Sequence, residues 1–467
     1  MALPGADALR TAGLAALGAV LGALAIVIAY RTEPLVPLAA VLGVGIIALS
    51  IAQPMTVLYL ALAAIPLELF ALPLGGAGLT ATEGLFVLAA FGWAVGRLAQ
   101  GQPPWVATPL NRPIGLLLLS VVAGLGVTVE VFPVVRILVA WTVCALVVQM
   151  LVEDGRPETV QRVLITLSGA AAVVALVTIA QSGGQVQELS TLGDTAIGRG
   201  AGAFHDPNIL GTFLAMALPG ALAIGLAGPL AVRPFALGAF GLMLLGLALS
   251  LSRGGLLAGA GALLILLAWR PFRRVAIAAA VLVAVLTIAN ANPLTKVEQV
   301  QTVATRVLSV QYAGQSQFDQ RLAIYRETPR IIQDHLLFGV GANQYSVVAP
   351  RYGLVDPYTG YTFDHAHDIA LTIGAELGLF GLIALAWLVV MLVRVLWTAT
   401  VRARVHRGLG VAVAAALTAL ALQGLIDYTV RSNVVAALAA VFAGCAVVIA
   451  RSASEDPFLA QDRARAR

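Results

Sequence analysis

The chain has 467 residues, of which 60% are hydrophobic and 11% are charged, with a formal net charge of +5 and a mean hydropathy of +0.94. Soluble domains carry about 25% charged residues, so this composition excludes a water-soluble globular protein and is typical of a polytopic membrane protein. The pI near 9.5 does not indicate nucleic-acid binding, because arginines in the cytoplasmic loops of membrane proteins determine topology. The two cysteines, Cys144 and Cys445, lie in apolar runs and form neither a disulfide framework nor a zinc motif.

Apolar runs recur along the chain, and a membrane helix needs about 20 such residues. The first run is long for a signal-peptide core and further runs follow it, so we interpret it as a retained membrane anchor. We expect an all-α polytopic membrane protein with about 12–14 transmembrane helices. The runs fall at about 11–29, 35–51, 55–74, 79–97, 113–129, 133–152, 163–181, 207–227, 234–252, 254–269, 275–290, 368–395, 409–426 and 433–450.

Arginine clusters predict the orientation of these runs. Placing the clusters at 270–274, 394–407 and 451–467 in the cytoplasm puts both termini inside. The segments 182–206, 252–253, 291–367 and 427–431 then face outward. We therefore divide the chain into transmembrane helices (1–290), a large periplasmic loop with helices (291–367), C-terminal transmembrane helices (368–450) and a cytoplasmic tail (451–467).

The large loop is expected to contain a helix over about 317–335. Thr328-Pro329 can restart that helix, since threonine suits the cap and proline the first turn. The glycine-rich stretch 339–343 then predicts turns. The apolar run that follows the loop contains Glu376, for which we expect a polar partner because a carboxylate within a membrane is costly.

Two short outward segments combine arginine with glycine. The first segment is Gly-Arg199-Gly-Ala-Gly-Ala-Phe-His-Asp206-Pro-Asn208. Asp206 or Asn208 can cap the next helix, and a helix start with an arginine attracts anions. An ordinary loop and cap is the alternative. In Ser252-Arg253-Gly-Gly, the flanking glycines allow a ligand to approach the backbone, whereas the alternative is an arginine that reaches toward the interface.

The expected loop helix carries further charged residues. Arg321 and Tyr325 share one helical face, since they are four residues apart. We interpret Arg326 and Arg330 as a solvated charged face.

The stretch Asp364-His365-Ala-His367-Asp368 directly precedes a long apolar run. Ionisable groups at such a boundary often mark a site, and we expect this of His367, whereas we interpret His365 as a surface-loop histidine. A zinc or manganese site formed by these residues is the competing interpretation. Their crowding into five consecutive positions, without a known ligand spacing, favours no metal.

The segments around Arg199, Arg253 and Arg321 and the histidine stretch at 364–368 follow one another in an order that resembles the O-antigen ligase and O-antigen polymerase-like membrane glycosyltransferases. The resemblance covers about 198–381 and is most specific at the end, where His367, Gly378 and Gly381 match the family pattern and Asp368 departs from it. It implies a GT-C-like fold in the bacterial inner membrane, with an active site that faces the periplasm.

The resemblance also implies transfer of a glycan from an undecaprenyl-pyrophosphate donor to a glycan or glycolipid hydroxyl, with inversion and without a metal or other cofactor. His367 is then the catalytic residue, either as general base or as a cation. Arg253, Arg321 and Arg199 bind the pyrophosphate, and Asp368 and Tyr325 are second-tier residues. Asp427 and Arg431 lie beyond the resemblance and join the second tier because they share the outward face between the last two apolar runs.

Two alternatives to a ligase stay open. A polysaccharide polymerase uses the same chemistry with another acceptor. A lipid-linked glycan transporter would instead need coupling carboxylates deep in the bilayer, for which Glu68, Glu83 and Glu376 are the candidates. The bilayer is the expected environment in every case, and no nucleic-acid partner is expected.

Overall fold

The computed structural model describes residues 35–74, 77–182, 188–192, 195–267, 269–275, 277, 317–355, 360 and 362–453. The predicted anchor at 11–29 lies outside the described residues, and so do nearly all of the predicted span at 275–290 and nearly all of the predicted tail.

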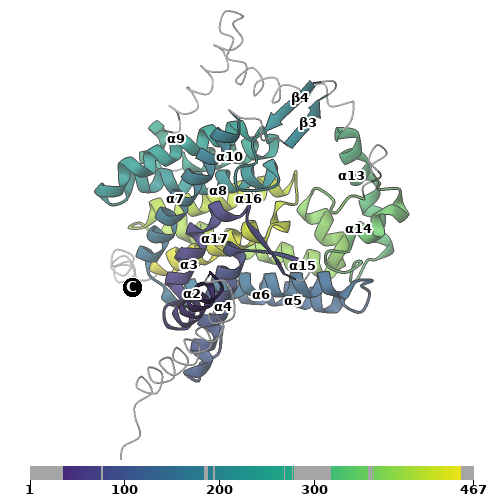
Figure 1. The fold of residues 1–467 in the computed structure, drawn as a ribbon, viewed down its shortest axis with the longest axis horizontal. Coiled ribbons are helices and arrows are strands. Elements are labelled where there is room, and N and C mark those ends of the chain that lie inside the picture. Colours follow the sequence, from purple (N-terminus) through teal and green to yellow (C-terminus); the bar gives the residue numbers. More distant parts are fainter. Residues whose placement is uncertain are drawn as a thin grey trace, which may run out of the picture.

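The described residues form a helical bundle, which confirms the all-α polytopic membrane fold (Figure 1). Eight helices are long and apolar enough to cross a membrane, and four shorter apolar helices accompany them, in the part of the chain described. In chain order the bundle helices are α2 (Leu35–Ala52), α3 (Pro54–Ala63), α4 (Ala81–Ala99), α5 (Asn111–Gly124), α6 (Val131–Asp154), α7 (Pro157–Ser182), α8 (Pro207–Ala227), α9 (Arg233–Leu249), α10 (Arg253–Leu266), α15 (Ile369–Trp397), α16 (Arg407–Gly424) and α17 (Asn433–Ser452).

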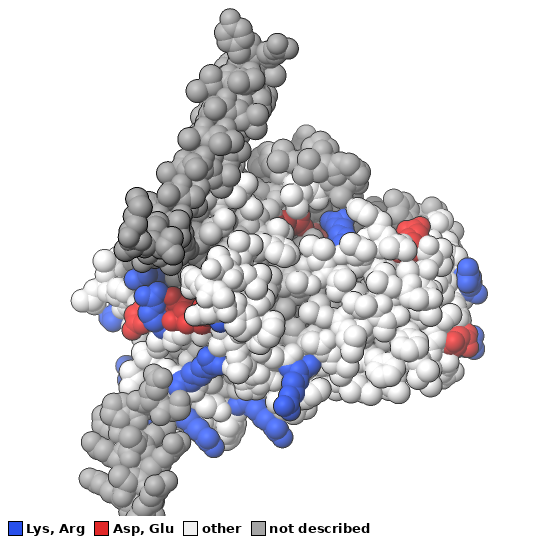
Figure 2. Space-filling view, turned by 90° about the horizontal axis from the view of Figure 1, so that it is seen from below, with Lys and Arg blue, Asp and Glu red and all other residues white. Residues whose placement is uncertain are grey.

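Helices α8, α16 and α17 form the centre of the bundle. The apolar part of α8 is 89% buried, whereas the corresponding parts of α6 and α15 are 22% and 17% buried. Large apolar side chains on those two helices are exposed, as expected for a surface that contacts lipid. Figure 2 shows wide areas without charged side chains between small groups of charged ones.

One predicted span is wrong. The run at 55–74 contains the short helix α3, then a 3₁₀ turn (Ile65–Leu67), and then β1 (Ala71–Leu74), which pairs antiparallel with β2 (Ala77–Thr80) beyond the run. Pro66 and Pro73 explain the break, because proline removes a backbone donor and disfavours helix at the residue before it. A second hairpin pairs β3 (Glu188–Leu192) with β4 (Thr195–Arg199).

Three helices begin at the same end of the bundle with a side chain that caps them. The carboxylate of Asp206 accepts a hydrogen bond from the Asn208 amide at the start of α8, and Ser252 and Asp368 cap α10 and α15. Each cap satisfies an amide that the helix leaves unpaired. The positive ends of three helix dipoles therefore converge on one region.

The large loop packs over this end. Its helix α13 (Gln317–Asp334) confirms the predicted helix, but it continues through Pro329 instead of restarting there. The Thr328 hydroxyl bonds the Tyr345 hydroxyl at 2.6 Å, so it does not act as a cap. The short helix α14 (Tyr345–Val348) and a 3₁₀ turn (Ala349–Tyr352) follow.

A glycine-rich turn fastens the loop to α15. Gly339 has φ +66°, and a Cβ there would lie 2.3 Å from the backbone carbon of Glu376, so only glycine fits. The Glu376 carboxylate accepts hydrogen bonds from the Asn343 and Tyr345 amides at 2.8 and 3.4 Å. This confirms the expected polar partner, and it ties the loop to the helix that begins beside the histidines.

Candidate active site

Asp427, in the link between α16 and α17, is the centre of the polar cluster at this end. Its side chain is 2% exposed. Its Oδ1 accepts hydrogen bonds from His365 Nε2 at 3.1 Å, His367 Nδ1 at 3.0 Å and the Tyr428 amide at 2.9 Å. Its Oδ2 accepts one from Asn208 Nδ2 at 2.9 Å. A buried carboxylate with four donors is fully satisfied and fixes the groups around it.

His367 presents one ring nitrogen to Asp427 and leaves the other unbound. Among the described residues Nε2 has no hydrogen-bond partner. The backbone has φ +52°, which is uncommon outside glycine, and the Tyr325 hydroxyl donates to the His367 carbonyl at 3.2 Å. The carboxylate therefore fixes the tautomer with the proton on Nδ1, and Nε2 carries the lone pair.

His365 is not the surface-loop histidine that its position suggested. It is 3% exposed, and its Nδ1 donates to Asp364 Oδ1 at 2.5 Å while its Nε2 donates to Asp427. The rings of His365 and His367 lie 4.2 Å apart. Because both nitrogens of His365 donate to carboxylates, this ring is arranged to be an imidazolium.

The two histidines differ in their pKa. Burial lowers the pKa of His365, but the hydrogen bonds to Asp364 and Asp427 outweigh it and raise the pKa above its usual value. Burial also lowers the pKa of His367, and the nearby charges of His365 and Arg321 lower it further despite the bond to Asp427. These opposite pKa shifts favour the neutral form of His367 and the charged form of His365.

The pKa values of Asp427 and Asp364 are both lowered. Burial raises the pKa of Asp427, but the bonds from His365 and His367 lower it well below its usual range. Burial also raises the pKa of Asp364, and the His365 bond and the Arg431 charge bring it down to about 2. Both carboxylates are ionised at neutral pH.

A second layer of contacts holds this centre. Arg431 bridges two acidic side chains, with Nη1 at 3.2 Å from Asp364 and Nη2 at 2.6 Å from Asp206. The Ser252 hydroxyl donates to Asn208 Oδ1 at 2.8 Å, which connects the start of α10 with the start of α8. Segments far apart in sequence are thus joined into one network.

The two central arginines lie at the edge of the network. Arg321 Nη1 donates to the Ile426 carbonyl at 3.2 Å, next to Asp427. Arg253 is the first residue of α10, directly after the cap Ser252, and the charges of Arg253 and Arg321 act on each other. No described carboxylate forms an ion pair with either arginine. Two guanidinium groups without an ion-pair partner among the described residues, beside an imidazole nitrogen that is likewise unbound there, form a site suited to an anionic ligand.

The remaining predicted residues lie as follows. Arg199 ends β4, and its side chain is outside the described part of the chain. The Asp368 carboxylate caps α15 by accepting from Leu371 and has no bond to either histidine. Arg330 pairs with Glu327 on an exposed face, as a solvated arginine would.

A metal is the alternative for three of these groups. His365, His367 and Asp427 each offer a ligand atom, and these atoms lie within 4.8 Å of one another. The set differs from the one that the sequence suggested, since Asp364 binds His365 and Arg431 and Asp368 caps a helix. Both histidines already donate a proton to the same carboxylate oxygen, which would have to be given up for metal binding.

Residues 238–386 match the family described as O-antigen ligase. This match supports an O-antigen ligase/polymerase-like family for the chain. The matched region contains Arg253, Arg321, His365 and His367, and Asp427 lies beyond it. A search of curated proteins finds no match to the chain. The family suggests a multi-pass membrane enzyme that acts on lipid-linked glycans.

Proposed function

We propose that the protein is an inverting, metal-independent glycosyltransferase of the O-antigen ligase type. It moves a glycan from an undecaprenyl-pyrophosphate donor to a sugar hydroxyl at the periplasmic face of the bacterial inner membrane. The observation that carries this proposal is the geometry of His367, which is bound to Asp427 through Nδ1, has no partner at Nε2 among the described residues, and lies beside Arg253 and Arg321.

In the proposed reaction His367 is the general base. The acceptor oxygen attacks the anomeric carbon while its proton moves to His367 Nε2. The bond from the anomeric carbon to the phosphate oxygen breaks, and the pyrophosphate leaves on its lipid. One displacement inverts the anomeric centre. General-base assistance of this kind contributes about 10²–10⁴-fold.

Arg253 and Arg321 stabilise the leaving group. The pyrophosphate gains negative charge as the bond breaks, and preformed donors at that position lower the barrier. The converging starts of α8, α10 and α15 add the same sign of potential. These groups supply the positive charge that a metal supplies in other transferases, which supports metal independence.

His365 and the second layer position the base. The His365 imidazolium shares Asp427 with His367, so it limits how far the carboxylate raises the basicity of His367. Arg431 holds Asp364 against His365. Asp427 and Arg431 are thus proposed to act through His367 and not on the substrate.

Analysis of lipid-linked glycans in a deletion strain tests this function. Long chains stranded on the lipid carrier, cleared by the wild-type gene and not by His367→Ala, are expected of a ligase. Accumulated single repeats would assign the polymerase reaction instead, and chains trapped in the cytoplasm would assign the transporter. A reporter fused near Gln315 tests the orientation and should behave as periplasmic; a cytoplasmic signal would contradict the site's placement.

A further inference from the structure

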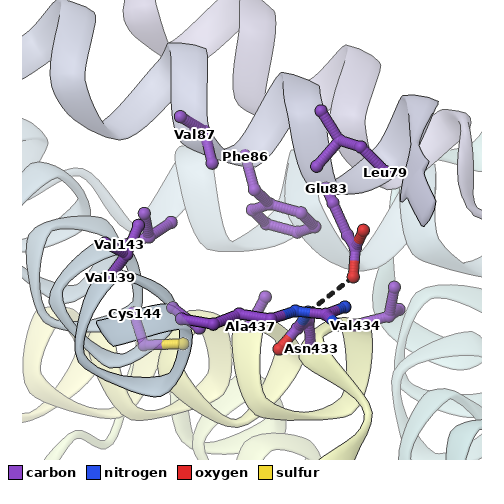
Figure 3. Close-up of a pocket in the computed structure, with 12 residues that line it drawn as sticks. Leu79, Glu83, Phe86, Val87, Val139, Val143, Cys144, Asn433, Val434 and Ala437 are labelled. Carbon is purple, nitrogen blue, oxygen red and sulfur yellow. Dashed lines mark hydrogen bonds between the residues drawn. The ribbon is translucent and has the colours of Figure 1, made fainter. Parts of the chain in front are cut away.

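A pocket lies between α4, α6 and α17, and neither His365 nor His367 lines it. Its volume is about 130 Å³. Figure 3 shows polar Glu83 and Asn433 at one end and Val87, Val143 and Cys144 toward the other. The residues that line it are Leu79, Glu83, Phe86, Val87, Arg136, Val139, Ala140, Val143, Cys144, Asn433, Val434 and Ala437.

The walls of the pocket are membrane helices. All three helices meet the criteria of length and composition for a membrane span, and α6 is the least enclosed of them. Val139 on α6 is 45% exposed. A pocket beside such a helix opens toward lipid, so a hydrocarbon chain is the solute that reaches it.

The rim of the pocket is charged. Arg136 is exposed and lies five residues after the start of α6, which is about 7–8 Å along the helix axis. None of the ion pairs among described residues includes Arg136. A cation this near the end of a span is at the depth of lipid headgroups, where a phosphate can neutralise it.

Glu83 adds a negative charge to the same rim. One carboxylate oxygen accepts from the Asn433 amide group at 2.6 Å, and the other accepts from the Thr80 amide at 3.1 Å. These bonds orient the carboxylate and come from neutral donors, and none of the ion pairs among the described residues includes Glu83. A ligand that suits both Arg136 and Glu83 carries a phosphate and an ammonium group.

The helices that bound the pocket differ from the one that carries Arg253. Arg253 begins α10, which packs mainly against α8 and α16, whereas the pocket is bounded by α4, α6 and α17. Its volume is close to the about 150 Å³ of an apolar cavity that holds benzene, so it accepts a segment of one chain.

We propose that this pocket binds a zwitterionic bilayer phospholipid. Arg136 binds the phosphate, Glu83 faces the ammonium group, and part of one acyl chain fills the space between Phe86, Val143 and Ala437. This inference does not depend on the proposed glycosyl transfer.

Native mass spectrometry of the purified full chain, after exchange into phosphatidylethanolamine or phosphatidylglycerol nanodiscs, tests the proposal. One phosphatidylethanolamine should be retained, and phosphatidylglycerol should be retained at least ten-fold less. Arg136→Gln and Ala140→Phe should each reduce retention about ten-fold, while Arg112→Gln, which changes an exposed arginine outside the pocket, should not. Equal retention of both lipids, equal retention in Arg136→Gln and Arg112→Gln, or retention of an isoprenoid lipid instead would each overturn the proposal.

Cys144 gives a second measurement in the unchanged protein. It lines the pocket, whereas Cys445 is fully buried elsewhere and serves as an internal reference. In delipidated protein, added phosphatidylethanolamine should slow alkylation of Cys144 by N-ethylmaleimide at least five-fold relative to phosphatidylglycerol. An unchanged rate would contradict occupancy of the pocket.

Discussion

Replacement of Asp427 by asparagine removes one charge and almost no volume from the centre of the site. Asp427 accepts from both histidines and Tyr428 on one oxygen and from Asn208 on the other. If the asparagine oxygen faces the histidines, its NH₂ group faces the NH₂ group of Asn208. Two hydrogen-bond donors then oppose each other, and the bond to Asn208 is lost. If it turns, the amide group faces His367 Nδ1 and favours the proton on Nε2. Neither orientation preserves the network.

The expected cost follows from the hydrogen bond that holds His367. A bond to a charged group is worth about 1.5–3 kcal/mol, and each 1.36 kcal/mol of barrier is a factor of ten. Asp427→Asn should therefore lower kcat about ten- to a hundred-fold. The carboxylate also raises the pKa of His367, so the rise of kcat/KM with pH should move to lower pH in the variant.

The assay is transfer from a lipid-linked donor by purified protein, measured across pH, with unfolding temperature recorded in parallel. Asp368→Asn is the matched control, since the same change one residue from His367 affects only the cap of α15. It should leave the unfolding temperature nearly unchanged, because asparagine caps a helix about as well as aspartate, and it should lower kcat by less than a few-fold. Equal losses of kcat in the two variants, or full activity in Asp427→Asn, would refute the assignment of Asp427.

Arg321→Ala should lose about ten- to a hundred-fold in kcat/KM for the donor, and Arg321→Lys should be only partly active because lysine lacks the planar guanidinium fork. Arg330→Ala is the control and should stay within about two-fold of wild type. Equal losses at the two positions would contradict phosphate binding by Arg321. His365→Gln should destabilise the fold more at pH 6 than at pH 9. The folded pKa of His365 is raised, so its contribution is complete below the unfolded value of about 6.5 and is lost as pH rises through the folded pKa; a difference in unfolding temperature that does not depend on pH would be inconsistent with the bonds to Asp364 and Asp427. Activity should survive excess EDTA, whereas loss on chelation with rescue by one metal would assign a metal site to His365, His367 and Asp427.

The sequence was sufficient for the fold class and for part of the site. Arginine asymmetry places segments 182–206, 252–253 and 427–431 on one face, and the structure brings Asp206, Ser252 and Asp427 from these segments into one network. The position of His367 before a long apolar run marks it from the sequence. The arginine distribution and the position of His367 are local features of the sequence, so they can be recognised without knowledge of tertiary contacts.

The central position of Asp427 among these contacts could not be predicted from local sequence. Its link to Asn208 spans 219 residues, and its links to the histidines span about 60. The burial of His365 likewise arises from packing of an irregular loop, which has no hydrophobic period to reveal it.

Some helix boundaries could not be predicted from the sequence either. Helices α9 and α10 are separated without a loop by Leu251 with φ +51°, a conformation that leucine rarely adopts and that no propensity predicts. The short helix α3 ends because prolines follow it, although the apolar run continues through residue 74. The count of apolar residues does not distinguish a short helix followed by a hairpin from a full span.

The most direct test of the account is the activity of purified His367→Ala and His365→Ala on a lipid-linked glycan donor, compared with wild type across pH. Wild-type activity should rise with pH through a pKa below the usual histidine value, because burial and nearby cations favour the neutral ring. His367→Ala should lose about a hundred-fold or more, and His365→Ala much less. A reversed order, or activity that falls as pH rises through this range, would contradict the assignment of His367 as the base.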